Sequence, residues 1–239
     1  MDYFSKLLNS HKASKLFFYP SCGCDNIFPQ MFNIDCEIFV FTDYIDHLYF
    51  LSGSKKGVTL VNINSHIRKV TVAPAREQVE FLIKFTSKLR QADSHFHILH
   101  QDQLGFHFSF RNKDAILLCV DNNIGLSLIM DSGSKISYFI GVNDGCQEGG
   151  NYECVNSESW LNNILDVMHP DGLTYITDHF EHYWQSTEDP PYIHSNLNHR
   201  ITSIKQLDWM LENSMSRNPF PGLFRKDMIN FIYKIRSGC

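Results

Sequence analysis

Two features twenty positions apart, a small-residue turn and a carboxylate, could together bind a ligand with neighbouring hydroxyl groups. The turn is Ser21–Gly23, which follows an apolar run at 15–19, and Asp43 ends a second apolar run. A glycine in such a turn lets a ligand approach backbone N–H groups, and a carboxylate at the next strand end accepts vicinal hydroxyls. The spacing predicts a nucleoside-type site. The alternative is an ordinary turn and polar strand end, since the turn holds one glycine.

A second group of candidate residues lies in the segment 141–156, which reads GVNDGCQEGGNYECVN. Its carboxylates suit a general base, a polar substrate or a cation. Asp144 and Glu148 are the candidate catalytic residues, and with Glu153 they form the candidate carboxylate set for a metal enzyme. The alternative is a polar loop whose glycines only shape turns.

The seven cysteines predict neither a disulfide framework nor a zinc site. Their number is odd, their spacing is irregular and no secretory signal precedes them, so we expect reduced thiols. The pairs Cys22-x-Cys24 and Cys146-x7-Cys154, and the histidines in DHFEHYW, lack the spacing of well-defined zinc sites, so we predict no metal. Cys22 would suit nucleophilic catalysis only if a following helix lowered its pKa, and no base is assigned to it.

Composition limits the classes of partner. The 239 residues are 43% hydrophobic and 20% charged, with a formal charge of -5, which is ordinary for a globular protein. No Lys/Arg run exceeds two residues, which argues against a large nucleic-acid footprint. The start of the chain is unlike a secretory signal, and no apolar run is long enough to span a bilayer. We therefore expect a cytoplasmic protein. Binding to a protein partner is compatible with this composition.

The elements that must position these residues alternate between strands and helices. Apolar runs and turn residues predict strands at 15–19, 36–44, 57–64, 69–73, 96–100, 106–110, 115–120, 126–130, 135–144, 173–180 and 228–236. Helical spacing and capping residues predict helices at 3–13, 25–33, 74–92, 156–168 and 203–215, with 181–200 as a surface loop.

Several local expectations go with these elements. Asp25 is the expected N-cap of the second helix, and Asn122–Gly125 the expected hairpin or bent connection. Pro170 and Gly172 are expected to end the helix at 156–168. In the helix at 74–92 the expected apolar face is Val79, Leu82, Ile83, Thr86 and Leu89.

This alternation predicts one α/β domain over 1–239, with a doubly wound, mostly parallel sheet covered by helices on both faces. The section 95–134 is expected to add antiparallel strands in the middle of the chain.

The pattern resembles the class I S-adenosylmethionine-dependent methyltransferase fold over most of the chain. FFYPSCGCD and FVFTDY stand where that family has its first two motifs, and YFIGVNDG resembles its fourth strand. ILDVMHPDGLTYITDH resembles its helix–strand passage, with Asp171 where the family usually has glycine. LFRKDMINFIYKIR resembles its terminal antiparallel strand, which completes the expected Rossmann-like fold.

The resemblance implies S-adenosylmethionine as the cofactor. Asp43 would hold its ribose, Tyr44 would stack beside its adenine, and Asp144 would lie near the substrate. The residues implied to line the methionine and adenosine side are Tyr19, Pro20, Ser21, Cys22 and Gly23. Three hypotheses stay open: a methyltransferase of unknown substrate, a non-catalytic binding or interaction protein on the same scaffold, and a carboxylate-based metal enzyme.

Overall fold

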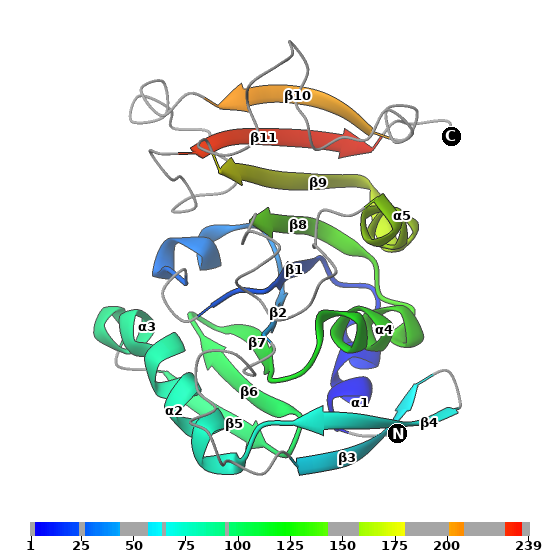
Figure 1. Cartoon of the computed structure of the whole chain (residues 1–239). Coiled ribbons are helices and arrows are strands. Elements are labelled where there is room, and N and C mark those ends of the chain that lie inside the picture. The colour runs from blue at the N-terminus through cyan, green and yellow to red at the C-terminus, as the bar shows by residue number, and fades with distance from the viewer. Residues whose placement is uncertain are drawn as a thin grey trace.

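The chain folds around one large sheet with helices on both of its faces. The computed structural model describes residues 3–23, 27–43, 57–63, 66–93, 96–142, 158–179, 201–207 and 228–235. Within these ranges the large sheet has nine strands in the order β10-β11-β9-β8-β1-β2-β7-β6-β5 (Figure 1). A separate two-stranded sheet pairs β3 with β4.

Five parallel strands form the centre of the large sheet. They are β7 (Lys113–Leu118), β2 (Ile38–Thr42), β1 (Leu16–Pro20), β8 (Ile136–Val142) and β9 (Met168–His179), in this spatial order. The chain first moves outward from β1 to β2 and β7, and then crosses back to β8 on the other side of β1. The order therefore reverses beside β1, which is where doubly wound sheets bind ligands, at the carboxyl ends of the strands.

Antiparallel strands extend the sheet at both edges. At one edge β6 (Gly105–Phe110) pairs with β7, and β5 (His97–Gln101) pairs with β6. At the other edge β11 (Met228–Ile235) lies antiparallel to β9, and β10 (Ile201–Leu207) pairs with β11. The expected α/β class, the added antiparallel strands and the antiparallel C-terminal strand are thus confirmed.

Helices cover the sheet on both faces, and each face has its own core. On one face lie α1 (Tyr3–Ser10), α4 (Asn122–Ser132) and α5 (Glu158–Val167), together with the hairpin of β3 (Gly57–Ile63) and β4 (His66–Val72). On the other lie the 3-10 helix η1 (Pro29–Asn33), α2 (Ala75–Phe85) and α3 (Ser87–Ala92). In Figure 1, α1, α4 and α5 lie on the right and α2 and α3 on the left.

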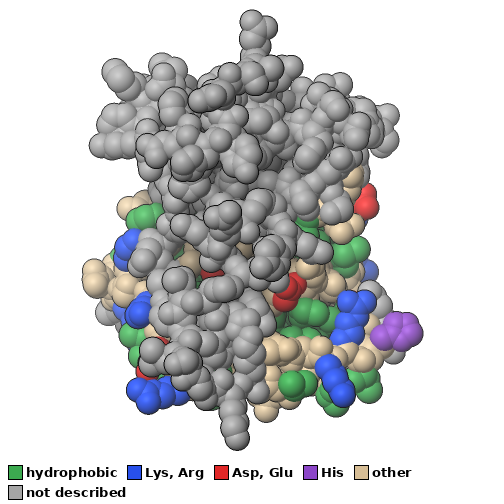
Figure 2. All heavy atoms as spheres, viewed as in Figure 1, with side chains coloured by type: hydrophobic (Ala, Val, Ile, Leu, Met, Phe, Trp, Pro, Cys, Tyr) green, Lys and Arg blue, Asp and Glu red, His purple; other side chains and the backbone are tan. Residues whose placement is uncertain are grey.

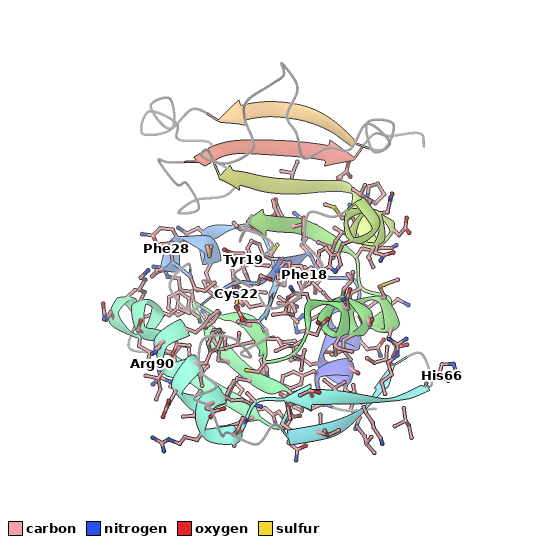
Figure 3. All side chains as sticks on the ribbon, viewed as in Figure 1. Phe18, Tyr19, Cys22, Phe28, His66 and Arg90 are labelled. Atoms are coloured by element: carbon pink, nitrogen blue, oxygen red, sulfur yellow. The ribbon has the colours of Figure 1, made fainter. Side chains whose placement is uncertain are left out.

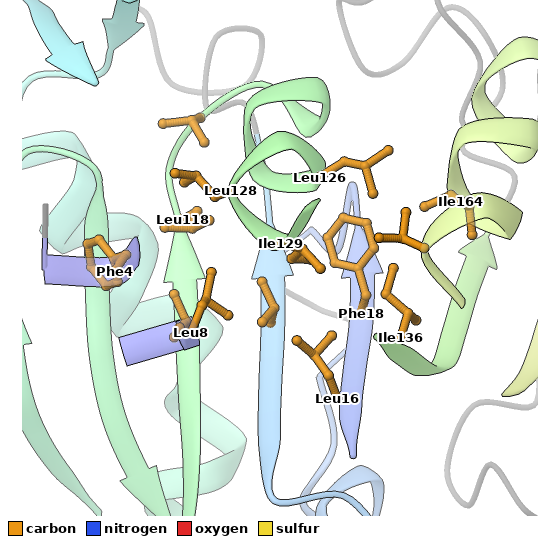
Figure 4. Packing of buried hydrophobic residues seen from close by; sticks show 14 of the residues in the cluster. Phe4, Leu8, Leu16, Phe18, Leu118, Leu126, Leu128, Ile129, Ile136 and Ile164 are labelled. Atoms are coloured by element: carbon orange, nitrogen blue, oxygen red, sulfur yellow. The ribbon is translucent and has the colours of Figure 1, made fainter. Parts of the chain in front are cut away.

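Alternation along the strands divides the apolar side chains between these two cores. Phe18 of β1 packs on the face of α4 and α5, whereas its neighbour Tyr19 points to the opposite face, as Figure 3 shows. Figure 4 shows the core on the face of α4 and α5, where Phe18, Ile129 and Ile136 meet between the sheet and the helices. Because β1 and β2 are buried on both faces, their residues read as unbroken apolar runs in the sequence.

The largest correction concerns residues 122–132. The sequence predicts a hairpin at Asn122–Gly125 and a strand at 126–130, but this segment forms helix α4. The Asp121 side chain caps its start by accepting a bond from the Asn123 N–H, and Gly133 ends it with a φ of 72°. The helix is apolar on most sides because it is largely buried, so periodicity cannot distinguish it from a buried strand.

Four smaller expectations are also wrong. Residues 203–207, which the sequence predicts as the start of a helix, lie in β10 because this segment pairs with β11. The short helix begins at Pro29 with Phe28 as its N-cap, so Asp25 is not the cap. In α2, Val79 and Ile83 are exposed. The side chains that α2 buries are Gln78, Phe81, Leu82 and Phe85.

The fourth error concerns the end of α5. Pro170 and Gly172 lie inside β9 instead of capping the helix, which ends at Val167. The loop predicted at 181–200 lies outside the described residues.

Candidate functional site

The predicted turn and carboxylate meet at the carboxyl edge of the parallel strands. The Gly23 N–H donates a hydrogen bond to Oδ2 of Asp43, with 2.7 Å between the heavy atoms. Asp43 follows β2 directly and Gly23 follows β1, and these strands pair in parallel register from Leu16–Ile38 to Pro20–Thr42. The spacing of twenty residues therefore does bring the two features into contact, beside the point where the strand order reverses.

All three backbone N–H groups of the turn donate within the protein. The Ser21 N–H donates to Oδ1 of Asn122 at 3.1 Å, and the Cys22 N–H to the carbonyl oxygen of Thr42 at 3.1 Å. The Gly23 N–H is held by Asp43, as described above. The expectation that a ligand approaches these turn amides is therefore not met, because each of the three already has an acceptor within the protein.

The side chain of Asn122 is the centre of this arrangement. Its Oδ1 accepts bonds from the Ser21 N–H and, at 2.6 Å, from the Thr42 hydroxyl, while its Nδ2 donates to Ser21 Oγ at 2.8 Å. We call these three bonds the Asn122 network. Only the oxygen can accept from a backbone N–H, so the amide orientation is fixed. Thr42 is fully buried and Asn122 nearly so.

Sequence reasoning missed Asn122 and Thr42. Asn122 was assigned to a turn, and nothing in one sequence indicates a contact across 101 residues. The available signal was local: Asp121 followed by an apolar run that ends at Gly133 is typical of a capped helix, and it places Asn122 in the first turn of that helix.

The other predicted site residues are placed as follows. The side chains of Tyr19 and Cys22 are fully buried in the core on the α2 face, and Pro20 is buried at the end of β1 (Figure 3). Ser21, Gly23 and Asp43 are half-buried. Tyr44, Asp144 and Glu148 lie outside the described residues.

The segment that contains Asp144 and Glu148 begins at the same edge. It follows β8, which ends at Val142 and is parallel to β1, so the chain leaves the sheet on the side of the turn at 21–23.

The described thiols are buried and poor nucleophiles. Burial raises the pKa of Cys119, with the Asp43 charge as a second cause, and burial also raises the pKa of Cys36. Cys22 is fully buried too, and the next helix among the described residues is η1, which begins at Pro29. The interpretation of Cys22 as a nucleophile therefore loses its basis.

A second polar cluster lies at the other end of the parallel strands, where β7 begins. The carboxylate of Asp114, near the start of β7, forms hydrogen bonds with His11 Nε2 at 3.0 Å and with His107 Nε2 at 2.9 Å. Nδ1 of His107 bonds the Tyr3 hydroxyl at 2.8 Å, and burial, followed by the Asp114 charge, raises the pKa of Tyr3. These bonds fasten α1 to the sheet. Among the described residues no group of three His, Cys, Asp or Glu side chains is arranged to hold a metal ion.

A cavity of about 380 Å³ lies near the turn between β5 and β6, which is on the carboxyl side of β7. The Gln78 amide closes part of it by donating to the carbonyl oxygens of Ala73 at 2.9 Å and Gln103 at 3.0 Å. The residues that line it are Val72, Ala73, Ala75, Gln78, Gln101, Asp102 and Gln103.

Hydrophobic and basic side chains gather on the hairpin of β3 and β4. Val58 and Leu60 are each 63% exposed and Ile67 is 72% exposed, and all three lie on the outer face of the hairpin. Lys69 pairs with Leu60 across the hairpin. Figure 2 shows hydrophobic, basic and histidine side chains together at this end of the molecule. The part of the chain that the structure describes contains no helix that is long and apolar enough to cross a bilayer.

Comparisons with known proteins find similarity at the level of structure and not of sequence. No protein-family model matches the chain, and a search of curated proteins finds no relative. Among solved structures, a protein described as an antibiotic-related methyltransferase aligns with 99% of this chain and 95% of its own, at 12% identity and a TM-score of 0.45. At this identity and TM-score the match assigns no activity to the chain.

Proposed function

We propose that this chain binds a nucleoside-type ligand, S-adenosylmethionine in the first instance, and transfers a methyl group to a substrate that is not yet known. The observation that carries the proposal is the bond between the Gly23 N–H and Asp43, at the carboxyl edge beside the strand reversal. This bond supports the proposal because it fixes a carboxylate at the end of the strands where doubly wound folds bind a ribose.

The chemistry of the available groups fits such a ligand. A carboxylate has about four acceptor sites, which suits the two neighbouring hydroxyl groups of a ribose, and Oδ2 of Asp43 also accepts the Gly23 N–H. Ser21 Oγ accepts from Asn122, so its own proton is available to a ligand acceptor. In this proposal Asp43 holds the ribose hydroxyls and the turn forms one wall, with Tyr44 beside the adenine. The bound cofactor would supply a methyl group on a sulfonium.

The substrate side of the proposal uses Asp144 and Glu148. Since their segment leaves the sheet from β8 at the same edge as the turn, we assign them the removal of a proton from the substrate group that receives the methyl.

The test is calorimetric titration of S-adenosylhomocysteine into the wild type and two variants. Asp43→Asn keeps an acceptor for the Gly23 N–H but removes the charge, so we expect an affinity about ten- to a hundredfold weaker. Asp35→Asn is the matched control, because Asp35 is exposed and paired with Lys15 at the other edge of the sheet. No heat from folded wild-type protein, or unchanged affinity in Asp43→Asn, would refute the proposal.

A second candidate is a non-catalytic interaction protein on the same scaffold. It is favoured by the three turn amides, which all donate within the protein, and by the exposed Val58, Leu60 and Ile67 of the hairpin. The same titration separates the two candidates. Folded protein that gives no heat with S-adenosylhomocysteine removes the methyltransferase and leaves the interaction protein.

A further inference from the structure

Helix α4 reaches the candidate site through the side chain of Asn122. The Asn122 network joins the first turn of α4 to the ends of both β1 and β2, through Ser21 and Thr42. Asn122 is 8% exposed and Thr42 is fully buried, so these bonds are largely shielded from competing water. Within the described part of the chain, Asn122 is the residue whose side chain hydrogen-bonds to Ser21.

Ser21 has a backbone conformation that favours glycine. Its φ is 47°, in the left-handed region, where a Cβ atom crowds the following carbonyl oxygen. Turns of this kind, after the first strand of a doubly wound sheet, use glycine for the tight bend. Two of the three bonds in the Asn122 network go to Ser21, one to its N–H and one to its hydroxyl. They hold the serine in a conformation that it would otherwise leave.

The helix that carries Asn122 is itself held in place. A Cβ atom on Gly125 would overlap the Thr42 Cγ2 methyl, so α4 lies as close to β2 as a glycine allows. The next residue, Asn123, accepts a bond from Trp160 Nε1 of α5 at 2.9 Å. The two consecutive asparagines thus connect the turn after β1 with the helix that follows the segment of Asp144 and Glu148.

We propose that Asn122 is a positioning residue of the candidate site. By holding Ser21, Asn122 fixes the turn in the conformation in which the Gly23 N–H donates to Asp43. It thereby fixes the orientation of the Asp43 carboxylate towards a ligand. Asn122 acts through Ser21 and does not touch the ligand. The identity of the ligand rests on the function proposed above, whereas the positioning of the turn does not.

The experiment is a double-mutant cycle of Asn122→Ala and Ser21→Gly with two readouts. The first is hydrogen exchange of the Gly23 amide, and the second is the affinity for S-adenosylhomocysteine. In the wild-type background we expect Asn122→Ala to speed the exchange about tenfold and to weaken binding about tenfold. In the Ser21→Gly background both effects should fall below about threefold, because glycine adopts the left-handed conformation without support.

Asn123→Ala is the matched control, since it removes an asparagine bond from the same helical turn without touching Ser21. It should leave Gly23 exchange unchanged. The proposal is overturned if Asn123→Ala speeds that exchange as much as Asn122→Ala does. It is also overturned if Asn122→Ala lowers the melting temperature without changing Gly23 exchange, or if Ser21→Gly gives no rescue.

The two proposals fail in different ways. A wild type that binds no S-adenosylhomocysteine refutes the proposed function, and the exchange readout then still decides the role of Asn122. A wild type that binds, with Asn122→Ala binding equally well, refutes the positioning role alone.

Discussion

Replacing Gly125 with alanine should destabilise this protein, although the same change inside a helix normally stabilises it. The added Cβ would overlap the Cγ2 methyl of Thr42, while its next contacts, Thr42 Cβ at 3.4 Å and Leu118 Cδ1 at 3.8 Å, are ordinary. Thr42 is a branched side chain on a buried strand, and turning it away would break its bond to Asn122. The overlap therefore cannot be relieved by rotating Thr42 without losing this hydrogen bond.

The expected magnitude follows from three terms. Overpacking of a filled core costs about 1–3 kcal/mol. Losing the bond from the Thr42 hydroxyl costs about 1 kcal/mol, and the better helix propensity of alanine returns about 1 kcal/mol. The last two nearly cancel, so Gly125→Ala should lower the free energy of unfolding by about 1–3 kcal/mol. For a chain of this length that is about 2–12 °C in melting temperature.

Urea unfolding of a double-mutant set is the assay. Thr42→Ser removes the Cγ2 methyl and keeps the hydroxyl bond to Asn122, so it opens the space that the new Cβ needs. In the Thr42→Ser background, Gly125→Ala should be neutral or stabilising by up to about 1 kcal/mol. Equal destabilisation in both backgrounds, or stabilisation in the wild-type background, would show that the close approach of α4 to β2 is wrong.

Three further predictions concern other parts of the fold. Phe39→Ala should cost about 3–5 kcal/mol in urea unfolding, because the ring is buried with two other phenylalanine rings at centroid distances of 4.6 and 5.0 Å; a cost below about 1 kcal/mol would contradict this packing. Burial and Asp114 raise the pKa of Tyr3, so its contribution is full below about pH 10 and is lost as pH rises through the folded pKa. The wild type should therefore lose stability more steeply than Tyr3→Phe above that pH, and equal slopes would count against it. Burial raises the pKa of Cys36 and Cys119, so peptide mapping should find their alkylation at pH 8 roughly a hundredfold slower than in urea, and equal rates would show that they are accessible.

The strands around the site could be predicted from the sequence, and so could the position of the turn and Asp43 at the same end of the sheet. β1 and β2 are buried on both faces, which leaves unbroken apolar runs, and the polar residues that follow mark where they end. Parallel pairing then brings the two strand ends to one edge, so Gly23 and Asp43 meet. These properties depend on local composition and on one short connection.

The parts that could not be predicted depend on contacts between distant segments. Residues 203–207 belong to the helix predicted at 203–215, but they lie in β10, whose pairing with β11 decides their conformation. Helix α4 was missed because a short, buried apolar run fits a strand equally well. The support of Ser21 by Asn122 depends on where α4 lies, and one sequence does not reveal that.

The separation of 101 residues between Ser21 and Asn122 has a consequence for synthesis in the cell. Chains grow at about 5–20 residues per second, so the turn after β1 waits about 5–20 s before the residue that holds it has been added. For most of that interval the first two strands have already been synthesised, but Ser21 lacks the bonds from Asn122 that support its left-handed backbone. The candidate site is therefore completed only once the middle of the chain has emerged, and a nascent chain stopped before residue 122 would carry Asp43 beside a turn that lacks the bonds from Asn122.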